Sequence, residues 1–222
     1  MHSNKIGLPS DAQIAQTLKP YYSAALTAKF CDQVRAYIEL LRRWNRRISL
    51  TTVTDPAQVL RFHFGESLFA IDRVAIRHGR LADVGSGAGF PAVPIRMALE
   101  GLHVTLIESN RKKSAFLCEV VRELKLANVD VSPFRMEDVV DRESAFDFVT
   151  ARAVLIDDSA LAWASSALKR DGKAVLWLGQ EDSAKISLSS RFHWRPEAKI
   201  PGSQTRVVLV GTNALASERC ST

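Results

Sequence analysis

Cysteine is scarce in this chain. Its three cysteines, Cys31, Cys118 and Cys220, lie far apart along 222 residues. Metal sites and disulfide frameworks both require cysteines at characteristic spacings, and none of those spacings occurs here. We therefore expect free thiols, no metal site and a cytoplasmic location.

Long hydrophobic runs are absent as well. No apolar stretch approaches the roughly 18 residues that predict a membrane span. The first twenty residues include Asp11 and several polar side chains, so they lack the apolar centre of a signal peptide. Hydrophobic residues nevertheless make up 46% of the chain, which suits one α/β domain with a sizeable core. We expect no association with a membrane.

Acidic residues are few in the first part of the chain. Residues 1–80 contain 12 Lys and Arg but only six Asp and Glu, whereas residues 81–222 contain 18 of each. The formal net charge of +6 therefore lies entirely before residue 81. A localised basic face is typical of a nucleic-acid partner, and we favour that interpretation over an ordinary solvated helical surface.

The most informative stretch is residues 81–91, which read LADVGSGAGFP. A short apolar strand ends at Asp83, and three glycines follow at alternate positions. Glycines let the backbone turn sharply and leave room for a ligand against it. Pro91 suits the first turn of a following helix. The pattern predicts a strand, a ligand-binding loop and a helix, although a tight turn without a ligand is the alternative.

The loop differs from a dinucleotide-binding loop in two respects. Its third glycine comes one position earlier than in G-x-G-x-x-G, and Asp83 would repel a pyrophosphate. A carboxylate instead suits a phosphate-free ligand that carries an ammonium and a sulfonium. We therefore predict that Asp83, Gly85 and Gly87 bind S-adenosylmethionine.

A second predicted strand, residues 103–107, ends at Glu108. Glu108 follows Gly85 by 23 positions, close to the ~20 positions at which an acid binds ribose hydroxyls in a βαβ unit. We expect Glu108 to bind the ribose of the cofactor. The alternative is a strand end exposed to solvent.

Hydrophobic periodicity predicts alternating helices and strands along the chain. Helices are expected over residues 29–47, 56–71, 111–126 and 159–168, and Thr54 or Asp55 caps the second of them, which begins at Pro56. Strands are expected at 129–131, 145–149, 174–178 and 206–210, and irregular structure over 181–205. This order predicts a doubly wound parallel sheet of the α/β class. We divide the chain into a basic helical extension (1–75) and a sheet domain (76–222).

Ligands of such sheets bind beyond the carboxyl ends of the strands. Gly85, Glu108, the pair Met136–Glu137 and Arg152 all follow predicted strands there. Their convergence predicts one site at that edge.

Arg152 and His63 are the candidate catalytic residues. Arg152 either binds the cofactor, orients a base of the nucleic-acid substrate or pairs with Asp147. A lone histidine on a partly apolar helix is usually structural, so His63 either fills that role or contacts the substrate.

Four segments together resemble the RsmG (GidB) family of bacterial 16S rRNA guanine-N7 methyltransferases. They are LRRWNRRISLT (41–51), DVGSGAGFP (83–91), ELKLANV (123–129) and TARA (150–153). The resemblance, which spans roughly residues 30–180, implies a Rossmann-like S-adenosylmethionine-dependent methyltransferase sheet with an N-terminal helical extension. It also implies methyl transfer to N7 of a guanine in 16S rRNA, with cofactor contacts at Gly85, Phe90, the Glu108 region, Met136, Glu137 and Arg152.

The chain departs from the family pattern at three positions. Ala92 replaces a glycine, Leu178 replaces a lysine before Gly-Gln, and Phe62 replaces an arginine before His63. Two alternatives follow: an rRNA-binding paralogue that keeps the cofactor pocket but has impaired catalysis, or a methyltransferase for another substrate. The partner that we expect is 16S rRNA or the small ribosomal subunit, bound by a monomer.

Overall fold

A computed structural model describes residues 7–139 and 145–214. Cys220 lies outside these ranges, whereas Cys31 is buried, Cys118 is exposed, and neither forms a disulfide. No helix within the described ranges is long and apolar enough to cross a membrane.

The N-terminal part of the chain is helical. α1 (Asp11–Leu18) is capped by a capping box formed by Ser10 and Gln13. α2 (Ala28–Asn45) is capped by Thr27, whose hydroxyl accepts a hydrogen bond from the backbone N–H of Phe30. The helix predicted from Pro56 starts at Asp55, whose carboxylate accepts from the backbone of Gln58. It comprises α3 (Pro56–Val59), a π-helical turn η1 (Leu60–Gly65) and α4 (Glu66–Val74). The sequence did not indicate the π-turn.

A central sheet follows, and its strands alternate with helices. The elements are β1 (Gly79–Val84), α5 (Ala92–Ala98), β2 (Leu102–Ile107), α6 (Arg111–Glu123), β3 (Val129–Ser132), a 3₁₀ turn η2 (Met136–Asp138), β4 (Phe146–Arg152), α7 (Asp158–Ala167), β5 (Leu168–Gly179), α8 (Gln180–Ile186), β6 (Phe192–Trp194), β7 (Ala198–Lys199) and β8 (Arg206–Asn213). The strand order is β3-β2-β1-β4-β5-β8-β6, with β7 also paired to β8.

The prediction of a parallel sheet is right for β1 to β5 and wrong for the C-terminal strands. β8 runs antiparallel to β5, and β6 and β7 run antiparallel to β8. Antiparallel neighbours need no helical crossover, and β7 is joined to β8 by residues 200–205 alone. The prediction of irregular structure over 181–205 is also wrong, because α8, β6 and β7 are too short to produce a clear periodic signal.

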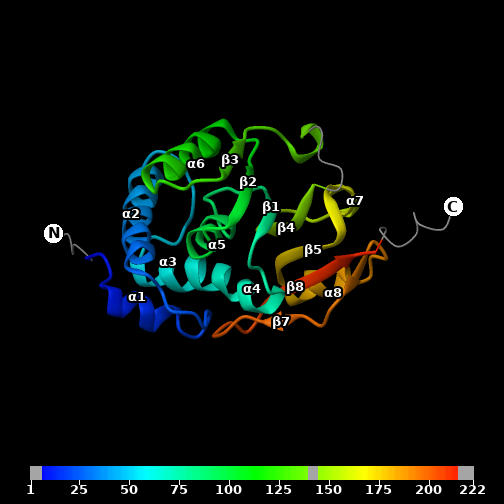
Figure 1. The fold of residues 1–222 in the computed structure, drawn as a ribbon, viewed down its shortest axis with the longest axis horizontal. Coiled ribbons are helices and arrows are strands. Elements are labelled where there is room, and N and C mark those ends of the chain that lie inside the picture. The colour runs from blue at the N-terminus through cyan, green and yellow to red at the C-terminus, as the bar shows by residue number, and fades with distance from the viewer. Residues whose placement is uncertain (1–6, 140–144, 215–222) are drawn as a thin grey trace.

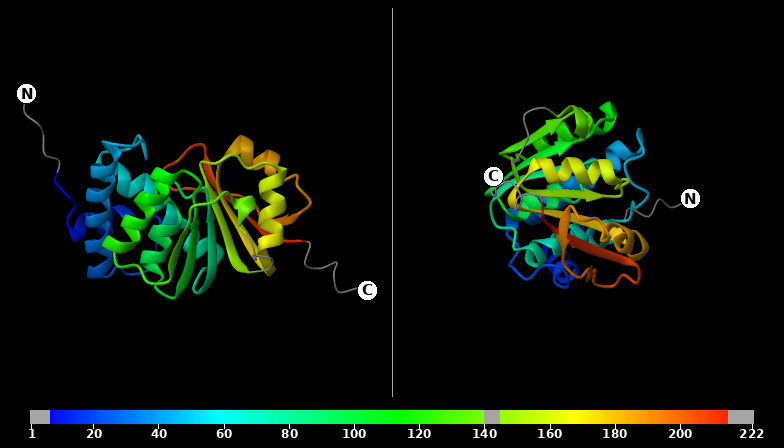
Figure 2. Two further views of the ribbon diagram at one scale, coloured as in Figure 1. Left: turned by 90° about the horizontal axis from the view of Figure 1, so that it is seen from above. Right: turned by 90° about the vertical axis from the view of Figure 1, so that its right-hand side faces the viewer.

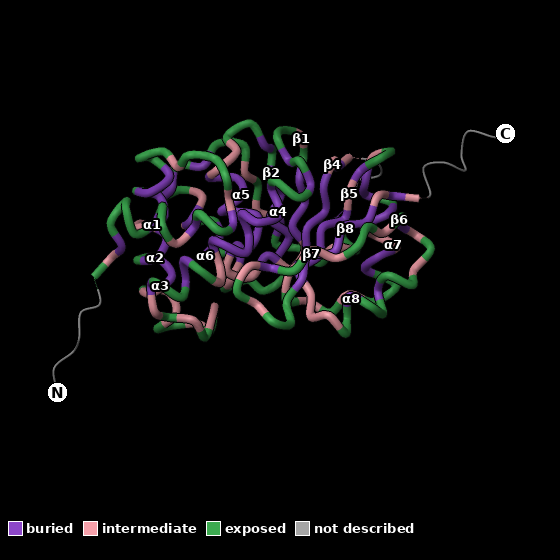
Figure 3. Tube along the Cα trace, turned by 90° about the horizontal axis from the view of Figure 1, so that it is seen from below, coloured by how far each residue is buried: buried purple, intermediate pink, exposed green. Residues whose placement is uncertain are grey.

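Helices cover both faces of the sheet. Figures 1 and 2 show α1 and α2 at one end of the molecule and α7 and α8 at the other, with the strands between them. The strands supply two hydrophobic cores by alternation: Val175 and Trp177 face the core shared with α1–α6, whereas Ala174 and Leu176 face the core under α7 and α8. β4 and β8 are buried along most of their length (Figure 3), and β5 is buried over residues 174–177.

The first of these cores joins the helical extension to the sheet. It contains Ile14, Ile38 and Phe64 from the N-terminal helices together with Leu81 and Val104 from β1 and β2. The boundary at residue 75 remains a prediction, and the two parts on either side of it share one core.

Candidate active site

A cavity of about 750 Å³ opens at the carboxyl edge of the parallel strands. Its volume is typical of a small-molecule site. Three parts of the chain line it. The glycine loop contributes residues 85–88 and Phe90, and the segments beyond β2 and β4 contribute Glu108, Ser109, Lys113 and residues 152–154. The helical extension contributes Asn45, residues 49–52 and His63. The sheet and the extension therefore share this cavity.

The glycine loop follows β1 with a backbone that requires glycine. Gly85, Gly87 and Gly89 have φ angles of 66°, 55° and 83°, in the left-handed region that other residues rarely adopt. A Cβ atom at Gly89 would also collide with the Tyr37 hydroxyl, which donates a short hydrogen bond to the Ala88 carbonyl. α5 begins at Ala92, so Pro91 lies just before the helix instead of in its first turn as predicted.

Asp83 lies buried at the base of this loop. Its side chain is 1% exposed, and one carboxylate oxygen accepts a hydrogen bond from the Thr150 hydroxyl at 2.6 Å. The other oxygen, Oδ2, has no partner within the described residues. Burial raises the pKa of Asp83 from 3.8 to about 7, against the opposing effect of the hydrogen bond from Thr150. Asp83 does not itself line the cavity.

Glu108 joins the glycine loop to the start of α6. Its Oε2 accepts a hydrogen bond from the backbone N–H of Gly87, and its Oε1 accepts one from the backbone N–H of Asn110, both at 2.8 Å. The residue is 7% exposed and lines the cavity. The alternative of a solvent-exposed strand end is therefore wrong. Each carboxylate oxygen keeps a second lone pair for a ligand hydroxyl.

Arg152 is held from the helical extension. Its Nη2 donates to the Phe62 carbonyl at 2.7 Å and to Glu66 Oε2 at 2.8 Å, whereas its Nη1 is buried without a partner in the described residues. The expected alternative, a pair with Asp147, is wrong, because Asp147 pairs with Lys169 at 3.0 Å. Asp147 lies near the start of β4 and Arg152 at its end, and the ~3.3 Å rise per residue separates them along the strand.

His63 lies on the π-turn and faces the cavity. Its Nε2 lies 2.8 Å from the Thr51 hydroxyl, and its ring stacks on Phe90 with centroids 4.5 Å apart. Burial, with a smaller effect from Arg152, lowers the pKa of His63 from 6.5 to about 4, so the imidazole is neutral at neutral pH. Its Nδ1 is buried without a partner in the part of the chain that the structure describes. His63 is thus part of the packing and part of the cavity wall.

Met136 and Glu137 lie on η2 after β3, at the same edge of the sheet. Met136 packs against the core under α7, and Glu137 is exposed. Neither of them lines the cavity. Their role as cofactor contacts remains a prediction.

Sequence reasoning missed several residues that shape the cavity. The Asn45 side chain donates to the Thr51 carbonyl at 2.7 Å and accepts from the backbone of Leu50 at 2.8 Å, which fixes the loop after α2. Asn45 followed by a short polar segment was visible in the sequence, but nothing there indicated the partners. Glu66, the partner of Arg152, was missed because an acid on a helix is usually exposed.

The arginines at the end of α2 lie beside the cavity. Arg43 pairs with Glu119 of α6. Arg46 and Arg47 are exposed, and in the sequence they fall between two residues of the cavity wall, Asn45 and Ser49. Part of the positive charge of the extension, carried by Arg46 and Arg47, is therefore next to the cavity wall in the sequence.

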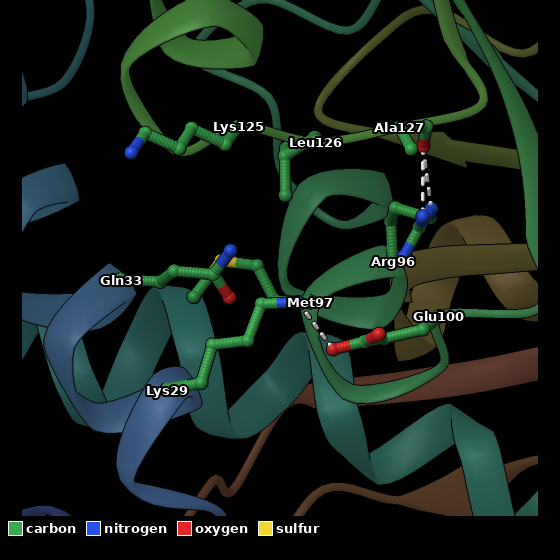
Figure 4. A pocket seen from close by; sticks show the side chains of 8 residues that line it. All are labelled: Lys29, Gln33, Arg96, Met97, Glu100, Lys125, Leu126 and Ala127. Carbon is green, nitrogen blue, oxygen red and sulfur yellow. Dashed lines mark hydrogen bonds and ion pairs between the residues drawn. The ribbon is translucent and has the colours of Figure 1, made fainter.

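A second, much smaller cavity of about 60 Å³ lies at the opposite edge of the sheet (Figure 4). Lys29 pairs there with Glu100 at 2.6 Å, and Arg96 donates to the Ala127 carbonyl at 2.7 Å. Its volume is too small for a cofactor. Within residues 7–139 and 145–214, no group of three or more His, Cys, Asp or Glu side chains could hold a metal ion.

Several solved structures with a similar fold are methyltransferases. The chain is similar to geranyl diphosphate C-methyltransferase from Streptomyces coelicolor A3(2), with a TM-score of 0.64 and 12% identity over 86% of this chain and 99% of that one. It is also similar to a SAM-dependent methyltransferase from Aquifex aeolicus, with a TM-score of 0.60 and 13% identity over 70% of this chain and 93% of that one. At these identities the likeness shows the fold, which is the Rossmann-like methyltransferase fold expected from the sequence.

Sequence relatives are more specific. Ribosomal RNA small subunit methyltransferase G from Xylella fastidiosa (strain 9a5c) is 40% identical over 75% of this chain and 76% of its own length. The protein of the same name from Xanthomonas campestris pv. campestris (strain B100) is 39% identical over 90% of this chain and 93% of its own length. The profile of the GidB family, described as rRNA small subunit methyltransferase G, matches residues 30–194. This chain belongs to the rRNA small subunit methyltransferase G (GidB) family.

Proposed function

We propose that this chain is an S-adenosylmethionine-dependent methyltransferase that methylates N7 of a guanine in 16S rRNA of the small ribosomal subunit. The observation that carries the proposal is the shared cavity, which the glycine loop bounds on one side and residues 45–52 of the basic extension bound on the other. A cofactor held by the loop and an RNA held by the extension would meet there. Membership of the family supports the same activity.

The residues of the site fit this cofactor. Among the described residues, Asp83 Oδ2 and Arg152 Nη1 are buried polar atoms without partners. One belongs to an acid and the other to a base, and such atoms are normally hydrogen-bonded in native proteins. An ammonium suits the first and a carboxylate the second. Glu108 retains acceptors for two ribose hydroxyls. We therefore assign cofactor binding to Asp83, Gly85, Gly87, Phe90, Glu108 and Arg152, and propose that Met136 and Glu137 complete the set.

When bound, the cofactor supplies a methyl group whose bond to sulfur breaks as a bond to guanine N7 forms. Guanine N7 carries a lone pair and no proton, so the chain need not supply a general base. Its task is to hold the two reactants in line at close distance. A side chain beside the reactants must also not protonate N7, because that would remove the lone pair. His63 meets this condition, since its pKa of about 4 leaves the imidazole neutral at neutral pH.

Transfer of a radiolabelled methyl group tests the proposal. The purified protein would be incubated with labelled S-adenosylmethionine and either small ribosomal subunits or naked 16S rRNA, and the RNA digested to nucleosides. We expect label in 7-methylguanosine. Label in another nucleoside or in protein would indicate a different substrate, and cofactor binding without any transfer would indicate a paralogue with impaired catalysis, the alternative raised by Leu178.

We further propose that the protein acts as a monomer in the cytoplasm, where ribosomal subunits are assembled. Sedimentation equilibrium should give a mass near 24.6 kDa. A mass that is a multiple of this value would contradict the monomer.

A further inference from the structure

Glu66 is a buried acid at the junction of the π-turn and α4. It is 2% exposed, and its carboxylate is shared between two arginines: Oε2 lies 2.8 Å from Arg152 Nη2, and Oε1 lies 2.7 Å from Arg206 Nη2. Its backbone carbonyl accepts a hydrogen bond from Trp177 Nε1 at 2.7 Å. The acid is thus fixed by residues of β4, β5 and β8.

Stability alone does not explain this arrangement. Burial raises the pKa of Glu66, and the charges of Arg152 and Arg206 oppose that effect. The cost of removing such ions from water often equals or exceeds the attraction between them, so a well-packed apolar side chain would serve the fold about as well. A role in fixing the geometry of a partner is the better explanation.

The partner that needs fixing is Arg152. A guanidinium is a rigid planar fork, so contacts to one terminal nitrogen also fix the other. Nη2 takes both of its contacts, Glu66 and the Phe62 carbonyl, from the same helical segment. Nη1 has no partner among residues 7–139 and 145–214, and Arg152 lines the cavity. Without Glu66, the Phe62 carbonyl would be the one acceptor left to hold the fork within the described residues.

We propose that Glu66 is a positioning residue of the active site, which holds Arg152 so that its free guanidinium nitrogen is presented to the carboxylate of the bound cofactor. The inference rests on the proposed function, since it takes the ligand of Arg152 from there. It extends the site to a residue that touches neither cofactor nor RNA.

A double-mutant cycle on ligand affinity tests it. The dissociation constant of S-adenosylhomocysteine, which carries the same carboxylate, would be measured by calorimetry for the wild type, Glu66→Gln, Arg152→Gln and the double variant. We expect each single substitution to weaken binding about tenfold. The double variant should bind no more weakly than Arg152→Gln alone, because Glu66 acts only through Arg152.

Arg206→Gln is the matched control. It breaks the other half of the same buried cluster and leaves the contact between Glu66 and Arg152 in place. We expect it to lower the melting temperature less than Glu66→Gln does, because the Arg206 side chain is 45% exposed and Glu66 keeps Arg152 as its partner, while the dissociation constant stays within about twofold of wild type. Glu66→Asp, which keeps the charge, should restore part of the lost affinity and serves as the test if Glu66→Gln does not fold.

Wild-type affinity in a folded Glu66→Gln or Glu66→Asp variant, or additive effects in the cycle, would overturn the proposal. The measurement uses no RNA, so it is separate from the proposed function. A wild-type protein that binds S-adenosylhomocysteine but methylates no RNA would refute the proposed function and leave the cycle interpretable.

Discussion

Asp83 and Glu108 are both buried carboxylates beside the glycine loop, and their hydrogen bonds set them apart. Glu108 accepts two backbone N–H groups, one on each oxygen. Asp83 has one oxygen without a partner in the described part of the chain, and burial raises its pKa to about 7. The difference makes Asp83 sensitive to pH near neutrality.

Asp83→Asn should change how stability depends on pH. In the folded protein the pKa of Asp83 lies above its ordinary value of 3.8, so stability is fully present below that value and is lost as the pH rises through about 7. The loss is on the order of a few kcal/mol. The difference in melting temperature between wild type and Asp83→Asn, measured from pH 4 to 8, should therefore shift in favour of the variant as the pH rises.

His63 acts in the opposite direction. Its pKa is lowered from 6.5 to about 4, so the stability that neutral His63 contributes to the folded protein is lost as the pH falls from 6.5 towards 4. Because both proteins in the comparison retain His63, their difference isolates Asp83. A difference that does not vary with pH would show that Asp83 is ionised throughout.

Glu108→Ala should weaken both cofactor binding and the apo protein. Loss of the acceptors for the ribose should raise the dissociation constant of S-adenosylmethionine at least tenfold. An acid at a solvent-exposed strand end would leave apo stability unchanged. Since the carboxylate is buried and holds two N–H groups, we now expect the apo melting temperature to fall by several degrees.

Glu108→Gln provides the comparison, because it keeps the size and one acceptor. It should melt between wild type and Glu108→Ala. Calorimetry and apo melting curves supply the two measurements. If both variants bound the cofactor like wild type, the ribose would lie elsewhere.

At the scale of elements, the C-terminal end of α2 brings basic residues of the extension close to the cavity wall. Arg43 is already engaged with Glu119 of α6. Arg46 and Arg47 are exposed and adjoin residues of the cavity wall. The RNA contribution of this helix is therefore expected chiefly from these two side chains.

Replacing Arg46 and Arg47 together by alanine should flatten the salt dependence of RNA binding. Each phosphate contact contributes a log–log slope of about −0.7 to −0.9, so the slope should fall by roughly 1.5, with cofactor affinity unchanged. The control is the pair Arg122 and Arg170, exposed arginines at the opposite edge of the sheet. Equal slopes for the two double variants would place the RNA face elsewhere.

At the scale of the whole molecule, the helical extension and the sheet are expected to unfold together. Ile38 and Phe64 are buried in the same core as strand residues, so removal of residues 1–75 would expose an apolar face of the sheet domain. The fragment 76–222 should aggregate or lack a cooperative melting transition. The full chain should show one transition whose calorimetric and van't Hoff enthalpies agree. Two separable transitions would contradict a shared core and support independent domains.

The hairpin between β7 and β8 ties the two ends of the chain together. The Pro201 carbonyl accepts from the Tyr21 hydroxyl at 3.2 Å, and the Gly202 carbonyl accepts from Arg61 at 3.2 Å. Arg206, which follows the turn, reaches Glu66. A segment predicted to be irregular therefore helps to fix the helices that carry His63 and Glu66.

The sequence by itself determined the order of β1 to β5, the glycine loop and the position of Glu108 at a strand end. These features depend on residues within a few positions of one another, which periodicity and turn chemistry report directly. The three positive φ angles of the loop require glycines at alternate positions. The sequence shows those glycines directly, so the loop could be predicted from it.

Only the tertiary structure decided which groups meet. Arg152 pairs with Glu66, 86 positions away, and not with Asp147, five positions away. The burial of Glu108, the neutral state of His63 and the antiparallel β8 likewise depend on how distant segments pack. Desolvation and ion pairing depend on the groups that surround a side chain in space. A local sequence pattern cannot predict those groups when they come from distant segments of the chain.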